Sequence, residues 1–159
     1  MKTLQYLVIH CTATPAGRAV TAADIRRWHL APVPEGRGWK QVGYTDIVHI
    51  NGYVENLVPN NEDGIVDSWE ITNGVKGINS VSRHVVYAGG LSADGQQAAD
   101  TRTTAQKIAL ANYVKEKIKA VPALKVAGHN QFAAKDCPCF DVPTWLRSIG
   151  VAEKNIYKK

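Results

Sequence analysis

Hydrophobic and polar positions along this chain form short β-rich runs separated by amphipathic segments. Residues 4–10 (LQYLVIH) and 84–90 (HVVYAGG) are mostly apolar, which is typical of strands buried on both faces. Residues 124–129 (LKVAGH) form a shorter run of the same kind. Residues 43–58 hold Asn51-Gly52 between two β-rich runs, which predicts a hairpin with a two-residue type I′ turn.

Three segments carry the start signals of helices. Thr21 with Asp24 resembles a capping box and opens a short helix, and Thr103 with Gln106 opens a long helix to about residue 120. Asp141 is the expected N-cap of a last helix. The apolar stripe of the long helix, its expected buried face, is Ile108, Ala111, Val114 and Ile118.

The order of these elements predicts the fold class. Strands interleaved with helices, together with one hairpin, indicate an α/β protein with a mixed central β-sheet flanked by helices. A chain of 159 residues fits one domain, so we expect a single domain over residues 1–159. The Pro- and Gly-rich residues 30–39 are expected to be a loop, and residues 59–83 to be irregular.

Composition narrows the class of protein. The hydrophobic fraction (45%) and charged fraction (21%) are ordinary for a globular chain, and no apolar run approaches the roughly 20 residues of a membrane span. The first apolar run contains Gln5, Tyr6 and His10, so it is interpreted as a strand and not as a signal peptide, and we expect synthesis in the cytoplasm. The net charge of +5 predicts attraction to a polyanion, which nucleic acid, a membrane surface or the bacterial wall would satisfy.

Candidate chemistry gathers at the ends of two predicted strands. His10 and His129 each end a strand, where ligand-binding groups collect in α/β sheets, and Cys137 follows on the next loop. Two imidazoles and one thiolate with an open fourth position are typical of a catalytic zinc site. Cys139 or Cys11 could instead complete a structural four-ligand site, although Cys11 should face away because neighbours in a strand point to opposite sides. Two buried thiols and two hydrogen-bonded histidines are the non-functional interpretation.

Four motifs follow one another along the chain: VIHCTAT, DIRRWH, VGYTDIVHINGYVE and GHNQFAAKDCPCFDV. Taken together and in this order, they resemble the zinc N-acetylmuramoyl-L-alanine amidases. This group contains the amidase-type lysozymes of tailed phages and the peptidoglycan recognition proteins. The resemblance runs from about residue 5 to 148 and implies a mixed sheet with zinc in a surface cleft.

The resemblance implies a role for each matching residue. His10, His129 and Cys137 match the three zinc ligands of the family. Tyr44, in GYTDI, matches a tyrosine that assists catalysis, and Lys135 matches a lysine with a similar role. The implied reaction is hydrolysis of the amide that joins the lactyl group of N-acetylmuramic acid to L-alanine, with Zn²⁺ and no organic cofactor. An ammonium group such as that of Lys135 suits an oxyanion at the scissile carbonyl.

The sequence also departs from the family pattern. Thr45 stands where relatives often have histidine, and no histidine lies between His49 and His84, where many relatives carry one in a central loop. Asn73 or Gly74 fills that place, which puts the rate or specificity of the enzyme in question. His84 is expected to be a solvated histidine at the end of a strand, with a position in the cleft as the alternative.

The remaining histidines and the tryptophans are given mostly structural roles. His29 is interpreted as structural and His49 as solvent-facing. Trp28, Trp69 and Trp145 could line a sugar groove, with core packing favoured for Trp28 and Trp145.

These patterns favour an enzyme that cuts bacterial peptidoglycan, released to the wall like a phage endolysin or working in cytoplasmic wall recycling. The alternatives are a non-catalytic peptidoglycan-binding module, a zinc endopeptidase on wall peptides, and a nucleic-acid binder with a structural zinc. The presence of Cys137 argues against the first, and the scattered basic residues argue against the last. We therefore expect a monomer whose partner is peptidoglycan, without a nucleic-acid partner or a membrane span.

Overall fold

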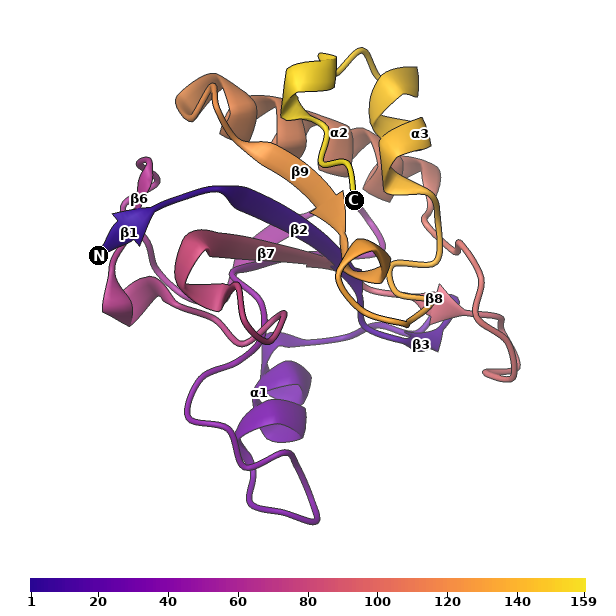
Figure 1. The fold of residues 1–159 in the computed structure, drawn as a ribbon. Helices are drawn as coiled ribbons and strands as arrows, with labels where there is room; N and C mark the ends of the chain where they lie inside the picture. Colours follow the sequence, from indigo (N-terminus) through magenta and orange to yellow (C-terminus); the bar gives the residue numbers. More distant parts are fainter.

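The structure, a computed structural model, describes residues 1–159 and is built around a five-stranded sheet (Figure 1). In spatial order the strands are β5 (Val54–Asn56), β4 (Asp46–Val48), β7 (Ser82–Tyr87), β2 (Tyr6–Cys11) and β9 (Lys125–Gly128). The last four run parallel to one another, and β5 pairs antiparallel with β4 at one edge. The predicted mixed sheet is therefore confirmed.

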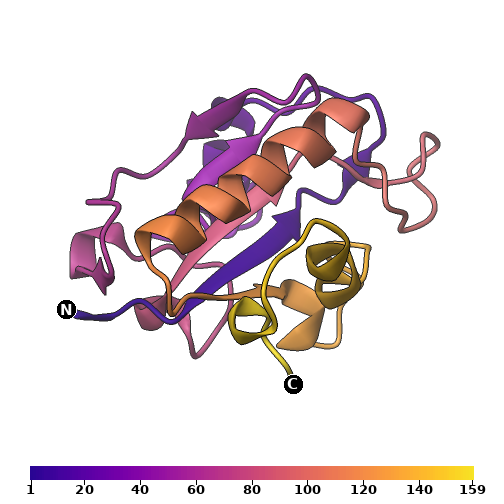
Figure 2. The ribbon, with the colours of Figure 1, turned by 90° about the horizontal axis from the view of Figure 1, so that it is seen from above.

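Helices cover both faces of this sheet, which is why its central strands are buried throughout. α1 (Ala22–Leu30) lies on one face, and α2 (Thr104–Ala120) and α3 (Val142–Ser148) lie on the other (Figure 1). Figure 2 shows α2 lying over the sheet and running roughly along the direction of its strands. All six residues of β7 are buried, although the first three, Ser82, Arg83 and His84, are polar. The strand begins two residues before and ends three residues before the apolar run 84–90 that was expected to form it.

The predicted helix starts are confirmed by their hydrogen bonds. Thr21 and Asp24 form a reciprocal capping box with both bonds at 3.0 Å, and Thr103 and Gln106 form a second box at 2.9 and 3.0 Å. Asp141 caps α3 by accepting from the Thr144 amide at 2.9 Å. Each cap satisfies amides that the first helical turn leaves unpaired and stabilises the protein by about 1 kcal/mol.

The predicted buried face of α2 is correct in part. Val114 is buried and Ile118 packs against the larger core, but Ile108 is 59% exposed. The buried residues of α2 are Gln106, Leu110, Tyr113 and Val114. Two of them are polar and have buried partners: the Gln106 amide donates to the carbonyls of Val48 and Ala88, and the Tyr113 hydroxyl donates to Asp46. Counting apolar residues alone therefore missed the polar part of the buried face and wrongly included Ile108.

The hairpin of β4 and β5 exists, but its turn is not the predicted type I′. A type I′ turn needs positive φ at both central residues, and only Gly52 has it here, at 87°. The His49 amide bonds to the Tyr53 carbonyl, and the Gly52 amide to the His49 carbonyl, both at 2.8 Å. These bonds define a three-residue loop with glycine in the left-handed position.

Short elements complete the chain. β1 (Lys2–Thr3) pairs with β6 (Ile65–Val66), and β3 (Thr14–Pro15) pairs with β8 (Gly90–Leu91). Residues 59–83 are mostly irregular, as predicted, apart from β6, the start of β7 and two single-turn helices. The 3₁₀ helices are Ser68–Glu70, Asn79–Val81, His129–Gln131 and Glu153–Asn155.

Candidate metal centre and active-site cleft

The three predicted ligand side chains converge beyond the carboxyl end of β2. His10 lies near the end of β2 and His129 directly follows β9, its parallel neighbour, while Cys137 lies on the loop that leads to α3. The Nδ1 atoms of His10 and His129 are 3.1 Å apart, and Cys137 Sγ is 3.9 Å from His10 Nδ1. All three ligand atoms lie within 4.8 Å of one another, so these residues form a candidate metal site.

The protonation states of these side chains suit metal binding. Burial lowers the pKa of His10 and of His129, so both rings stay neutral at physiological pH. Hydrogen bonds from Cys11, including its backbone amide at 3.2 Å, lower the pKa of Cys137 against the opposing effect of burial. Neutral imidazole and thiolate are the forms that coordinate a metal, and two nitrogens with one sulfur fit a borderline-soft ion such as zinc.

The Cys-Pro-Cys segment passes around the end of β2 and places one sulfur on each side of it. Cys137 lies beside His10, whereas Cys139 Sγ is 3.8 Å from Cys11 Sγ. Burial raises the pKa of Cys139 to about 12, and the hydrogen bond to Cys137 raises the pKa of Cys11, so both remain thiols. Neither belongs to the candidate metal group, so the geometry favours three ligands over the four-ligand alternative.

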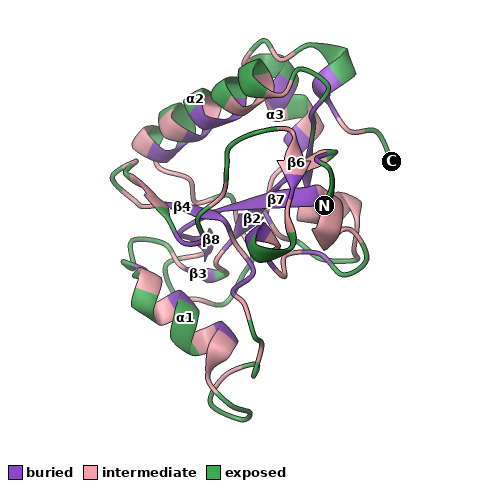
Figure 3. Ribbon diagram, turned by 90° about the vertical axis from the view of Figure 1, so that its left-hand side faces the viewer, coloured by how far each residue is buried: buried purple, intermediate pink, exposed green.

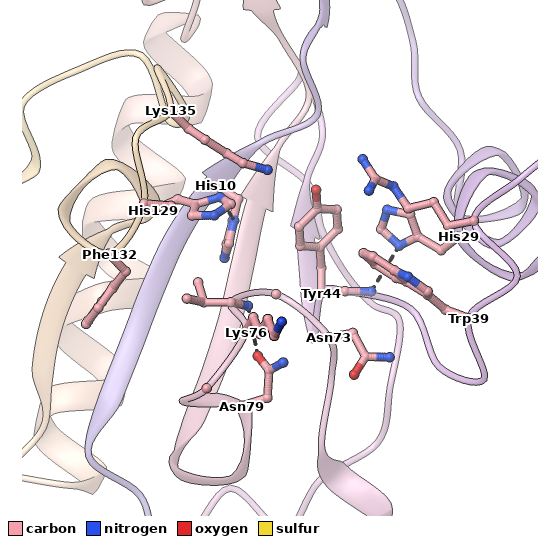
Figure 4. Close-up of a pocket in the computed structure, with 16 residues that line it drawn as sticks. His10, His29, Trp39, Tyr44, Asn73, Lys76, Asn79, His129, Phe132 and Lys135 are labelled. Atoms are coloured by element: carbon pink, nitrogen blue, oxygen red, sulfur yellow. Dashed lines mark hydrogen bonds between the residues drawn. The ribbon is translucent and has the colours of Figure 1, made fainter.

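A cleft of about 660 Å³ opens over the two histidines (Figure 4). Its charged lining residues are Arg37, Lys76 and Lys135, and no aspartate or glutamate lines it. The cleft is therefore positively charged and suited to an anionic substrate. Histidines, asparagines, glycines and a few apolar side chains form the rest of the wall.

Both predicted catalytic residues face this cleft. The ring centroid of Tyr44 is 5.2 Å from that of His10, and burial raises the pKa of its hydroxyl, which stays a hydrogen-bond donor. Lys135 is exposed on the loop before Cys137, and its ammonium group points toward His10 and Tyr44 (Figure 4). The structure thus brings together all five residues singled out in the sequence.

Comparison with known proteins decides the family. The sequence profile described as N-acetylmuramoyl-L-alanine amidase matches residues 1–140. The chain belongs to this amidase family. The enzyme class expected from the four motifs, an N-acetylmuramoyl-L-alanine amidase that hydrolyses peptidoglycan, is confirmed.

Similar proteins support the same assignment. The endolysin of Enterobacteria phage K11 is 32% identical over 148 residues, which are 92% of this chain and 87% of that protein. The Ph2119 endolysin of a Thermus scotoductus MAT2119 bacteriophage is 27% identical, with a TM-score of 0.68 over 99% of this chain and 88% of that one. The amidase LysC of Clostridium intestinale URNW is 16% identical and shares the fold, with a TM-score of 0.71 over 94% and 87% of the two chains.

One departure from the amidase pattern takes an unexpected form. His84 was expected to be solvated, but it is fully buried, and its Nδ1 lies 2.9 Å from His10 Nε2. Its other ring nitrogen lies 3.0 Å from Asn79 Oδ1. His84 therefore stands directly behind a candidate ligand, on the side away from the metal-facing atom.

Other residues of the amidase cleft were not identified from the sequence. Trp39, in the Pro- and Gly-rich loop, lines the cleft and packs 4.8 Å from the His29 ring. His29 is structural, as expected, because its Nδ1 accepts from the Gly43 amide at 3.0 Å. His49 is not simply solvent-facing, since its Nε2 lies 2.8 Å from Glu55 Oε1 and its ring stacks on Tyr53.

The three tryptophans considered for a sugar groove all lie outside the lining of the cleft. Trp28 and Trp145 are partly buried against the two apolar cores, as favoured from the sequence. Trp69 is 52% exposed. The direction in which a side chain points can be predicted from the sequence only within a regular strand or helix. The sequence therefore could not show that Trp39, which lies in a loop, faces the cleft.

The carboxylates near the motifs have other roles, which limits the chemistry of this amidase. Asp46 is buried against Tyr113 and Asn56, and Asp141 is the cap of α3. Asp136 is exposed and absent from the cleft lining. Cleavage of a sugar bond usually needs two carboxylates flanking it, so this cleft does not suit a glycosidase.

None of the helices is long and apolar enough to cross a bilayer.

Proposed function

We propose that this amidase uses one zinc ion held by His10, His129 and Cys137, with Tyr44 and Lys135 acting on the substrate. The observation that carries the proposal is the grouping of three ligand atoms within 4.8 Å beside a cleft lined by both catalytic candidates. We further propose that residues 1–159 act as one domain and as a monomer on peptidoglycan, without nucleic acid. Release to the wall in the manner of an endolysin is the proposed setting.

Zinc, when bound, polarises a carbonyl and lowers the pKa of a water ligand to about 7. The chain supplies the rest of the reaction environment. Lys135 offers a positive charge to the oxygen of the scissile amide, where negative charge develops as the carbonyl carbon becomes tetrahedral. Tyr44 remains protonated because of its burial, so it can donate a hydrogen bond to the same oxygen or orient the attacking water.

The charge of the cleft favours the bacterial wall as substrate. Arg37, Lys76 and Lys135 are its charged lining residues, and the chain carries a net charge of +5. Wall polymers are anionic, so the potential raises the rate at which they meet the cleft. This attraction favours anionic polymers as a class, whereas the assignment of the bond that is cut rests on membership of the amidase family.

Digestion of purified peptidoglycan tests the proposal. We expect stem peptides with new L-alanine amino termini, glycan strands with intact lactyl groups, and loss of this activity with a chelator. End-group labelling and mass analysis identify the products. New amino termini on other residues would support the endopeptidase alternative, and new reducing ends without amines would contradict the zinc mechanism.

A non-catalytic binding module is the second alternative. It has no need of a thiolate whose pKa is lowered or of three converging ligand atoms, and both are present here. Wall binding without any product release, from protein that carries one zinc per chain, would nevertheless decide for the binding module.

A further inference from the structure

We propose that His84 is a positioning residue for the metal centre: its ring fixes the tautomer and orientation of His10, in a space that Gly74 leaves free. This inference rests on the proposed metal centre. It gives a function to His84, which lies in β7, in a protein that has no histidine in its central loop.

The direction of each hydrogen bond follows from the ligand atom of His10. His10 Nδ1 faces His129 Nδ1 at 3.1 Å and Cys137 Sγ at 3.9 Å, so Nδ1 is its metal-facing nitrogen. Its Nε2 must then carry the proton and donate to His84 Nδ1 at 2.9 Å. His84 in turn carries its proton on Nε2 and donates to Asn79 Oδ1 at 3.0 Å. That oxygen also accepts from the Val75 amide at 2.8 Å.

The ring of His84 is held in place by its surroundings. It is fully buried, and both of its nitrogens have partners. It comes from β7 at the position opposite Val8 of β2, and strand alternation puts His10 on the same face as Val8. Because both nitrogens are occupied, His84 is not a fourth ligand and can act only through His10.

Gly74 is required by this ring and not by its own backbone. A Cβ atom at position 74 would lie 2.3 Å from His84 Nδ1 and 2.4 Å from its Cγ, closer than any real contact. The backbone of Gly74 is not in the left-handed region, so its conformation alone would accept a side chain. Glycine in the loop and histidine in the strand therefore form a complementary pair, because the His84 ring occupies the space that a side chain at position 74 would need.

The hydrogen-bond chain also ties the cleft wall to the metal centre. Val75 and Asn79 belong to residues 73–79, which supply six of the cleft-lining residues. Partners of this kind behind metal-binding histidines commonly change metal affinity by about 10- to 100-fold when they are removed. Here the partner is an uncharged imidazole, so it can orient His10 without adding charge to the centre.

Two substitutions separate this role from simple space filling. His84→Asn keeps an acceptor near the position of Nδ1, whereas His84→Leu fills the space without one. We expect His84→Leu to weaken zinc binding about 10- to 100-fold in a chelator competition, and His84→Asn to stay within about threefold of wild type. Wild-type affinity in His84→Leu, or equal losses in both variants, would overturn the inference.

A second variant covers the case in which His84→Leu does not fold. Gly74→Ala keeps all ligands and His84 itself but displaces the ring, so we expect weaker zinc binding here too; wild-type affinity would overturn the inference. In zinc-loaded wild-type protein, nitrogen NMR should show His10 protonated at Nε2 with an exchange-protected proton. A proton on Nδ1 would contradict the proposed tautomer.

These measurements also distinguish the inference from the proposed function. Zinc affinity is measured without peptidoglycan, so wild-type protein that binds zinc and fails to cut the wall would overturn the function and leave the role of His84 intact. Zinc binding that is indifferent to His84, in an active amidase, would do the reverse. Wild-type protein that binds no zinc at all would overturn both.

Discussion

The two faces of the central sheet are built for different purposes. The face under α2 and α3 carries a cluster of 16 buried apolar residues, whereas the face under α1 carries a cluster of eight. Figure 3 shows the buried stripe of α2 turned toward the strands. On the α1 side, His10 and His84 continue the surface of the smaller cluster and lead into the cleft.

Strand alternation is what separates the two purposes. His10 and Cys11 are neighbours in β2, yet one joins the candidate metal site and the other joins the larger core. The larger core can therefore carry most of the stability while the other face keeps buried polar groups and an open cleft. Substitutions on the two faces should accordingly differ in whether they change activity or unfolding.

The strongest contrast is expected between the two cysteines of the Cys-Pro-Cys segment. Cys137→Ser should abolish wall cleavage and weaken zinc binding, because it removes one of three ligands. Cys139→Ser should keep close to one zinc per chain, since its sulfur contacts Cys11 instead. Metal analysis of both purified variants measures this, and equal zinc loss would indicate a four-ligand structural site.

The next largest effect is expected in the cleft, where substitutions should lower turnover without changing the stability of the fold. Lys135→Ala and Tyr44→Phe should each lower turnover by about 100- to 1,000-fold, the usual effect of removing one group that stabilises an oxyanion. Both variants should fold and keep zinc. Turnover on purified peptidoglycan and zinc content are the measurements, and wild-type turnover in either variant would remove that residue from the mechanism.

The core face should show the opposite behaviour. Leu110→Ala removes a fully buried side chain of α2 and should lower the free energy of unfolding by about 2–5 kcal/mol. Its matched control is Ile108→Ala on the same helix, which should change stability by less than about 0.5 kcal/mol, since Ile108 is 59% exposed. Denaturant unfolding decides, and a larger loss in Ile108→Ala would restore the apolar stripe expected from the sequence.

The α1 face should also show a pH dependence of stability to which His29 contributes. Burial, with a smaller contribution from Arg37, lowers the pKa of His29 to about 4, against 6.5 in the unfolded chain. Between these values the unfolded chain binds more protons, so stability falls as pH falls from about 6.5 to 4. Above pH 6.5 both states are neutral and the effect vanishes.

His29→Asn keeps an acceptor for the Gly43 amide and cannot titrate. The slope of its unfolding free energy between pH 6.5 and 4 should therefore be shallower than that of wild type. Urea unfolding at several pH values measures both slopes. Identical slopes would show that His29 is protonated in the folded protein as readily as in the unfolded chain.

Much of the fold could be predicted because local signals agreed with it. The caps of all three helices are formed by residues within three positions of each other in the chain. The apolar runs of β2 and β7 are likewise visible in a short stretch of sequence. The three candidate ligands could be found because strand ends meet at one edge of a parallel sheet. The exposure of Ile108 could not be predicted, since it depends on buried hydrogen bonds of Gln106 with residues far away in the chain.

The contact of His84 with His10 was hidden for the same reason. It depends on the register of two strands that are 74 residues apart in the chain and on the glycine that clears the space. A sequence shows that a histidine begins a strand but does not show which ring it will meet. Trp39 and Arg37 were missed because an irregular loop has no period from which a direction can be derived.

The pairing of β2 with β9 brings together residues that are far apart in the chain. His10 and His129 are 119 residues apart in the chain, and Cys137 is 127 residues from His10. A metal held by these side chains would link residues 10, 129 and 137, and it would favour the folded state because the unfolded chain would lose loop entropy when these residues are brought together. The candidate centre is therefore complete only after residue 137 has been made. A growing chain that has not reached residue 137 lacks one of the three proposed metal ligands, even if its first strands are already folded.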